Sequence, residues 1–135
     1  MKIMGNRKGA SLIEVMISVA IFVLSMQSLL AVTLASMTQA KRAEYVHIAS
    51  GLAKNHMERL RAYSFSALAN AAETSTLINT DGDPDDDGTF IRTTTVTTSY
   101  NSNANLTQVT VQVWFVLKGV QSGQPMSVTS VMYNG

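Results

Sequence analysis

The stretch Lys8-Gly9-Ala10-Ser11-Leu12-Ile13-Glu14-Val15-Met16 lies close to the N-terminus of this 135-residue chain, where a long apolar segment begins. It joins a short basic segment to an apolar run that continues to Ala35, and Glu14 is the only ionisable residue between Leu12 and Ala35. As a helix rising about 1.5 Å per residue, this run would be roughly 36 Å long, enough to cross the core of a bilayer. A carboxylate in such a run is costly, which makes Glu14 a candidate functional residue.

This junction resembles the N-terminal signature of type IV pilins and of the pseudopilins of type II secretion. The resemblance rests on Gly9, on Ser11-Leu12-Ile13-Glu14-Val15 and on the apolar run that follows. It implies that a prepilin peptidase cuts after Gly9, that Ala10 becomes the N-methylated first residue, and that Glu14 helps assembly. The family usually has phenylalanine after the cut, and Ala10 departs from that pattern.

Two other interpretations of the N-terminus stay open. An ordinary secretory signal also places a basic segment before an apolar one, and Thr38-Gln39-Ala40 offers it a cleavage site. Against this, the apolar part of such a signal has about 7–15 residues, whereas this run is longer and carries Glu14. A plain single-span anchor would remain uncleaved and keep Met1. The positive charges before Gly9 favour a cytoplasmic N-terminus.

Composition excludes several classes of function. Charged residues make up 14% of the chain and the formal net charge is +1, so no basic patch indicates a nucleic-acid partner. The absence of cysteine removes disulfides and thiol chemistry, although many pilins close a C-terminal loop with a disulfide. His47 and His56 are nine residues apart, which is not the one-turn spacing of a metal site. No catalytic constellation is present, and we expect the protein not to be an enzyme.

The helix is expected to continue beyond the apolar run and to become amphipathic, ending at about Tyr63. The segment Ala49–Arg61 resembles the corresponding part of PilV-like minor pilins and of the related minor pseudopilins. Within the apolar run, Ser18 and Ser25 either mark close helix–helix contacts or bond their own backbone, and the second is the more common behaviour. The apolar residues that recur at steps of three and four are Tyr45, Ile48, Ala49, Leu52, Ala53, Met57 and Leu60.

The acidic stretch Asp81-Gly82-Asp83-Pro84-Asp85-Asp86-Asp87-Gly88 has two interpretations. Asp83, Asp85 and Asp87 alternate ahead of Gly88, as oxygen ligands do in the first half of a calcium loop. Thr94 stands where that loop would supply a bidentate glutamate. A Ca²⁺ site at the three aspartates and a solvated acidic turn therefore both stay open, and no other cofactor is expected.

The C-terminal half is expected to form strands. Phe90–Tyr100, Leu106–Leu117 and Met126–Tyr133 are rich in β-branched residues or alternate in polarity, with turn-forming clusters between them. They predict an antiparallel meander whose apolar face packs on the amphipathic helix. Ser64–Thr80 is ambiguous between a short helix and a covering loop, and we expect it to bury Trp114 on the other face of the sheet.

The fold class predicted is thus α+β: a long N-terminal helix, apolar in its first half and amphipathic in its second, packed on a small antiparallel β-sheet in a pilin-like manner. Residues 1–9 form the expected leader peptide, and residues 64–135 the small globular head. The long helix spans residues 10–63, with 10–37 as the transmembrane or fibre-core part.

The resemblance implies a minor pilin or pseudopilin that takes part in assembly, priming or modification of a type IV pilus, a fibre associated with cell adhesion. The implied partners are other pilin or pseudopilin subunits, the prepilin peptidase and the inner-membrane assembly platform. The implied location is the inner membrane, with the head extracytoplasmic, and the fibre after assembly. A type II secretion pseudopilin and a membrane-anchored or secreted binding module remain alternatives.

Overall fold

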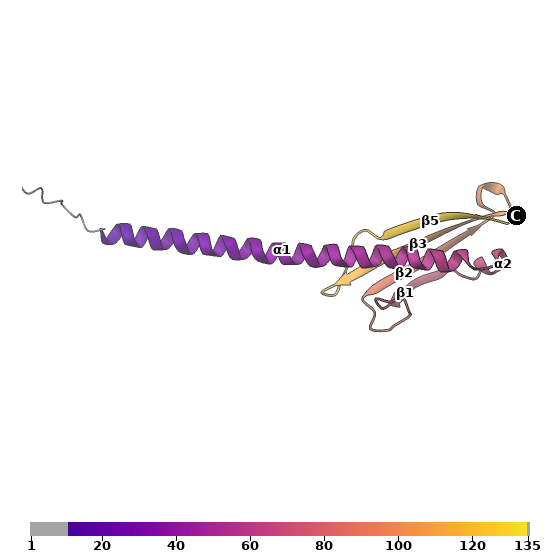
Figure 1. Ribbon diagram of the computed structural model, residues 1–135, viewed down its shortest axis with the longest axis horizontal. Coiled ribbons are helices and arrows are strands. Elements are labelled where there is room, and N and C mark those ends of the chain that lie inside the picture. The colour runs from indigo at the N-terminus through magenta and orange to yellow at the C-terminus, as the bar shows by residue number, and fades with distance from the viewer. Residues whose placement is uncertain (1–10, 135) are drawn as a thin grey trace, which may run out of the picture. The chain divides into compact units, whose positions relative to one another are not determined.

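The computed structural model describes residues 11–134, which belong to two compact units, one ending at Ala40 and the other beginning at Lys41. Helix α1 (Leu12–Arg61) contributes to both units (Figure 1). The remaining elements, all in the second unit, are α2 (Phe65–Leu68), β1 (Glu73–Ile78), β2 (Phe90–Thr98), η1 (Tyr100–Ser102), β3 (Leu106–Leu117), β4 (Val120–Gln121) and β5 (Met126–Tyr133).

The first unit is described only by the N-terminal part of α1, and all its residues from Ser11 to Ala40 are exposed. This part contains no proline and no glycine, so nothing interrupts the hydrogen-bonded turns. Its length and composition suffice to cross a membrane, although an N-terminal signal sequence would meet the same criterion. The expected long apolar helix is therefore present.

In the second unit, α1 buries one stripe against the sheet. The fully buried residues of the stripe are three or four positions apart, which is the spacing that brings side chains onto one helix face. Ala49 and Ala53 have no exposed surface, and such small side chains let a helix backbone approach a sheet closely. The amphipathic second half of the helix is thus confirmed. The buried stripe consists of Ala49, Leu52, Ala53, Met57 and Leu60.

The sheet is antiparallel, with β3 as its central strand. β1 pairs with β2, β2 pairs with β3, and the other side of β3 pairs with β5 and, at its C-terminal end, with β4. The β2–β3 register runs from Phe90 opposite Phe115 to Thr98 opposite Thr107. Lys118 and Gly119, both at positive φ, form the two-residue turn that leads into β4. Three of the five strands match the predicted ones closely.

Strand β1 lies in the segment 64–80, which the sequence leaves as a helix or a loop. The segment holds both a short helix, α2, and this strand. β1 has no regular alternation, because Ser75 adopts a positive φ of 50° where the register with β2 shifts. The predicted three-stranded meander therefore lacks the edge strand β1, and it also lacks the two-residue strand β4, which lies in a segment predicted as a turn.

The core lies on the face of the sheet that meets the helix. Val109, Val111, Val113 and Phe115 point into it from β3, as the alternation predicts. The buried residues Leu68 and Ile78 of the 64–80 segment join this same core. Trp114, on the opposite face of β3, is half-buried, and that segment does not place its buried side chains over it.

Candidate functional sites

Glu14 lies in the first turn of α1, where its backbone N–H donates to the carbonyl of Ser11 at 2.9 Å. A carboxylate at this end is favoured by the helix dipole, which places partial positive charge at the N-terminus. The side chain is exposed, as are all its neighbours along the helix. Glu14 thus presents a negative charge at the start of an uncovered apolar surface. Gly9 and Ala10, the predicted cleavage and methylation positions, lie outside the described residues.

Five hydroxyl side chains in the N-terminal part of α1 are satisfied by their own backbone. Each of the five donates to the carbonyl four residues earlier, at 2.8–3.0 Å, so it needs no partner on another helix. The expectation that Ser18 and Ser25 bond their own backbone is confirmed. The residues concerned are Ser18, Ser25, Ser28, Thr33 and Thr38.

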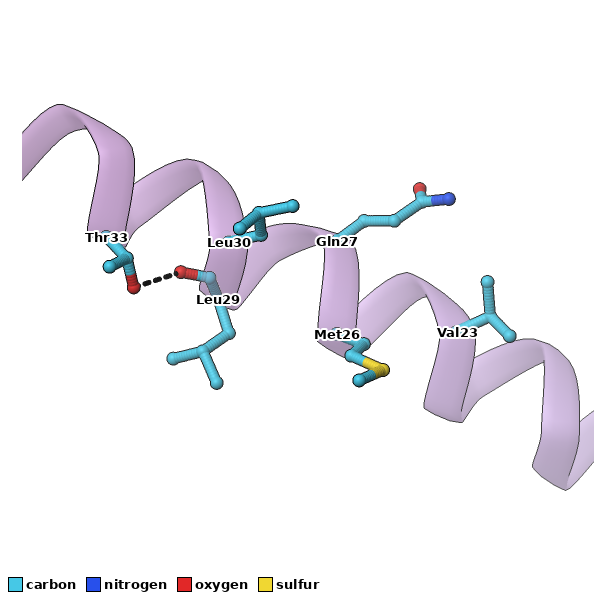
Figure 2. Close-up of a pocket in the computed structure, with 6 residues that line it drawn as sticks. All are labelled: Val23, Met26, Gln27, Leu29, Leu30 and Thr33. Carbon is cyan, nitrogen blue, oxygen red and sulfur yellow. Dashed lines mark hydrogen bonds between the residues drawn. The ribbon is translucent and has the colours of Figure 1, made fainter.

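Gln27 differs from these hydroxyl residues, because its side-chain amide makes no hydrogen bond within residues 11–134. It stands beside a shallow apolar hollow on the helix surface that is shown in Figure 2. Gln27 extends away from the helix there, on the same side as Val23 and Leu30, whereas Met26 and Leu29 project to the other side (Figure 2). The hollow is lined by Val23, Met26, Gln27, Leu29, Leu30 and Thr33.

A buried ion pair, which the sequence analysis does not predict, connects strands β1 and β2 on one side of the head. Arg92 of β2 donates through Nε to Glu73 Oε2 at 2.7 Å and through Nη2 to Glu73 Oε1 at 3.2 Å. Its Nη1 donates to the carbonyl oxygen of Gly82 at 2.8 Å. The side chain of Arg92 is only 5% exposed and that of Glu73 32%. Losing one partner of such a pair leaves a buried charge uncompensated, which typically costs about 3–5 kcal/mol.

His56 of α1 lies next to this pair. Its Nε2 is buried and has no hydrogen-bond partner within the described chain. Burial lowers the pKa of His56, the guanidinium of Arg92 lowers it further, Glu73 opposes this and Arg59 adds a smaller lowering. A small cleft beside His56 is lined by residues of the helix, the acidic loop and the sheet, among them Asn55, Asp81 and Arg92. The neutral imidazole is therefore the form that suits the folded head.

The acidic loop is shaped by side-chain hydrogen bonds to its own backbone. Asn79 Oδ1 accepts from the backbone N–H groups of Asp81 at 3.0 Å and Asp83 at 3.1 Å, and Asp85 Oδ1 accepts from that of Asp87 at 3.0 Å. Such turns form without a cation. The part of the chain that the structure describes contains no group of three or more His, Cys, Asp or Glu side chains that could hold a metal ion. Calcium binding at Asp83, Asp85 and Asp87 stays a prediction.

Two glycines explain why the loop closes tightly over the strand that precedes it. A Cβ at Gly88 would lie 2.7 Å from the backbone nitrogen and the carbonyl carbon of Ile78, far inside van der Waals contact. Gly82 has a φ of +88°, which favours glycine, and presents its carbonyl to Arg92. An ionic contact between helix and loop at this point, Arg59 to Asp83 at 3.9 Å, is exposed and contributes little.

Sequence reasoning missed Arg92, Glu73 and His56 as a cluster. One signal was present: Arg92 is two residues from Phe90, so the two-residue period of a strand places both on the buried face. Its partner could not be found in the same way, because β1 was not predicted.

Comparison of the chain with protein-family models, with curated proteins and with solved structures gave no match.

Proposed function

We propose that this chain is a minor pilin or pseudopilin, a structural subunit that a prepilin peptidase processes and that enters a type IV pilus. The observation that carries the proposal is the N-terminal junction: a basic segment, Gly9, and Glu14 at the start of an exposed apolar helix. An apolar helix surface of this kind needs either lipid or other helices around it, because water solvates it poorly. A pilin subunit meets both environments, because lipid surrounds its helix before assembly and other helices surround it in the fibre.

The second unit supports the same proposal. A helix packed on a small antiparallel sheet is what the resemblance to pilins implies for the head. The clusters that are present, around Arg92 and in the acidic loop, hold the fold together. We assign the protein a structural role for these reasons.

The proposed course follows from the charge and apolar pattern. The precursor sits in the inner membrane, with its basic N-terminus in the cytoplasm and the head outside it. After cleavage behind Gly9, the subunit joins other pilin or pseudopilin subunits on the inner-membrane assembly platform. A pseudopilin of type II secretion shares every step, and differs only in the fibre that it joins.

The first test is the N-terminus of the mature protein, determined by mass spectrometry of the membrane and fibre fractions. We expect it to start at methylated Ala10. We also expect Gly9→Leu to block cleavage and to leave the full-length precursor in the membrane. Gly5→Leu, a glycine substitution in the same leader, should leave cleavage intact and serves as the control.

A mature protein with a different N-terminus would identify a different class of protein. A mature protein that starts at Lys41 would identify a secretory signal cut after Ala40, and the head would then be a secreted binding module. A mature protein that retains Met1 would identify an uncleaved anchor. Maturation of Gly9→Leu to Ala10 would show that the leader assignment is wrong.

A further inference from the structure

Within the apolar run from Leu12 to Ala35, the side chains of Gln27 and Glu14 make no hydrogen bond to residues 11–134, and of the two only Gln27 lies away from the end of the run. The serine and threonine hydroxyls donate to carbonyls one turn back. The amide of Gln27 carries two N–H donors and a carbonyl acceptor, and it makes no hydrogen bond to residues 11–134. It also lies near the middle of the apolar run from Leu12 to Ala35.

In lipid this amide has no water to bond with. Burying an amide in hydrocarbon without a partner is unfavourable, and polar side chains such as glutamine drive association between membrane helices. This step depends on the proposed function, because it requires the helix to lie in a membrane. A partner helix must then supply an amide, hydroxyl or carboxylate at the same depth.

We propose that Gln27 is the contact at which two copies of this chain associate side by side in the membrane. The two amides form a reciprocal pair: each N–H₂ donates to the carbonyl oxygen of the other. Two parallel helices related by a two-fold axis along the membrane normal bring the same residue of each copy together. A charged residue at this position would repel its own copy, whereas an amide complements itself.

A second copy is favoured over an unrelated helix for two reasons. It carries a matching amide at the matching depth because the sequences are identical. The residues on the face of Gln27 are also suited to close packing, since the 3.6-residue period places Ala20, Val23, Leu30 and Leu34 on that face with it. Figure 2 shows Val23 and Leu30 projecting on the same side as Gln27.

The experiment uses the natural absence of cysteine. Single cysteines are placed in the full-length chain at Leu30, on the face of Gln27, or at Leu29, on the other side of the helix. Membranes from cells that make the protein are treated with an oxidant, and the disulfide-linked dimer is quantified on non-reducing gels. We expect Leu30→Cys to cross-link severalfold more than Leu29→Cys.

Substitutions of the amide complete the test. Adding Gln27→Leu to Leu30→Cys should reduce the dimer severalfold, while Gln27→Asn should retain it. Ser28→Leu is the matched control and should leave it unchanged, because the Ser28 hydroxyl already bonds the carbonyl of Leu24 at 2.9 Å. Loss of insertion cannot imitate the expected result, since Gln27→Leu makes the helix more apolar.

Undiminished cross-linking in the Gln27→Leu variant overturns the proposal, as does equal cross-linking from Leu29→Cys and Leu30→Cys. An adduct with a different protein that depends on Gln27 also overturns it, in favour of an unlike helix. The membrane fraction separates this failure from that of the proposed function. A membrane-embedded chain that forms no dimer refutes the Gln27 contact alone, whereas a chain absent from the membrane refutes the proposed function.

Discussion

At the scale of single residues, His56 couples the stability of the head to pH. Protonation would place a positive charge beside the guanidinium of Arg92 and close to Arg59, with Glu73 and the nearby Asp81 as the opposing charges. Because burial and Arg92 lower the pKa of His56, the unfolded chain binds this proton more readily than the folded one. The stabilisation that results is fully present above the unfolded pKa of 6.5 and is lost as the pH falls from there towards the folded pKa.

We therefore expect the melting temperature of the full chain in detergent to fall between pH 7.5 and pH 5, followed through the fluorescence of Trp114. His56→Gln should flatten this dependence. His47→Gln is the matched control, because His47 is exposed on the same helix and the chain has only these two histidines. If the two variants retained the same slope, the pH dependence would have to come from the carboxylates.

Arg92 shows what a sequence can and cannot predict at this scale. The burial of Arg92 follows from the two-residue period of a strand. Its hydrogen bonds, however, depend on Glu73, nineteen residues away, and on the Gly82 carbonyl. Those contacts arise only from the three-dimensional path of the loop. Glu14 is the opposite case, because the charge-to-apolar junction that singles it out is entirely local.

At the scale of elements, the acidic loop shows how one pattern serves two structures. Alternating aspartates are required by a calcium loop, but Asn79 and Asp85 also use side-chain oxygens to turn the backbone. Sequence alone does not distinguish carboxylates that face a cation from carboxylates that face solvent. In the structure, Asp83, Asp85 and Asp87 are all exposed.

Calcium binding can be tested directly on the full chain in detergent. If Asp83, Asp85 and Asp87 form a site, calcium should raise the melting temperature above that measured with a chelator. The double substitution Asp83→Asn/Asp87→Asn should abolish that rise, while the double control Asp81→Asn/Asp86→Asn should keep it. Equal melting with calcium and with chelator would leave an acidic turn.

Elements were predicted to the extent that their residues alternate or repeat. Helix α1 and strands β2, β3 and β5 have such periods, and their positions follow from the sequence. β1 does not, because its bulge at Ser75 and its exposed polar residues interrupt the period. Its pairing with β2 instead fixes it in place, assisted by the bridge from Ile78 to Pro84.

At the scale of the whole molecule, the proposed role requires Glu14 to act between subunits. Cleavage after Gly9 would create an amine at Ala10 that stays cationic when methylated. In a fibre, a staggered neighbouring subunit can present this amine to Glu14 among apolar side chains. Either charge alone costs several kcal/mol to bury, so we expect the pair to favour the docked register over a slipped one.

Glu14→Val and Glu14→Gln should therefore be cleaved normally but recovered severalfold less in sheared fibres than the wild-type chain. Glu14→Val should insert into membranes at least as well, which separates assembly from insertion. Glu44→Gln removes an exposed carboxylate beyond the apolar run and should assemble normally. Wild-type amounts of Glu14→Val in fibres would exclude the charge pair from the mechanism.

The ion pair between Arg92 and Glu73 has a consequence for the surface of the head. These are the only charged residues in the five strands, and they neutralise one another. Dissolved ions screen electrostatic forces, with a screening length of about 8 Å at 0.15 M salt. Because the strands carry no net charge, salt has little effect on the forces that this sheet exerts. The sheet can contact another surface through its outer threonine, glutamine and tryptophan side chains, and shape and hydrogen bonding therefore govern such contacts. The ionic strength of the medium instead affects contacts made by the charged residues of the helix and of the acidic loop.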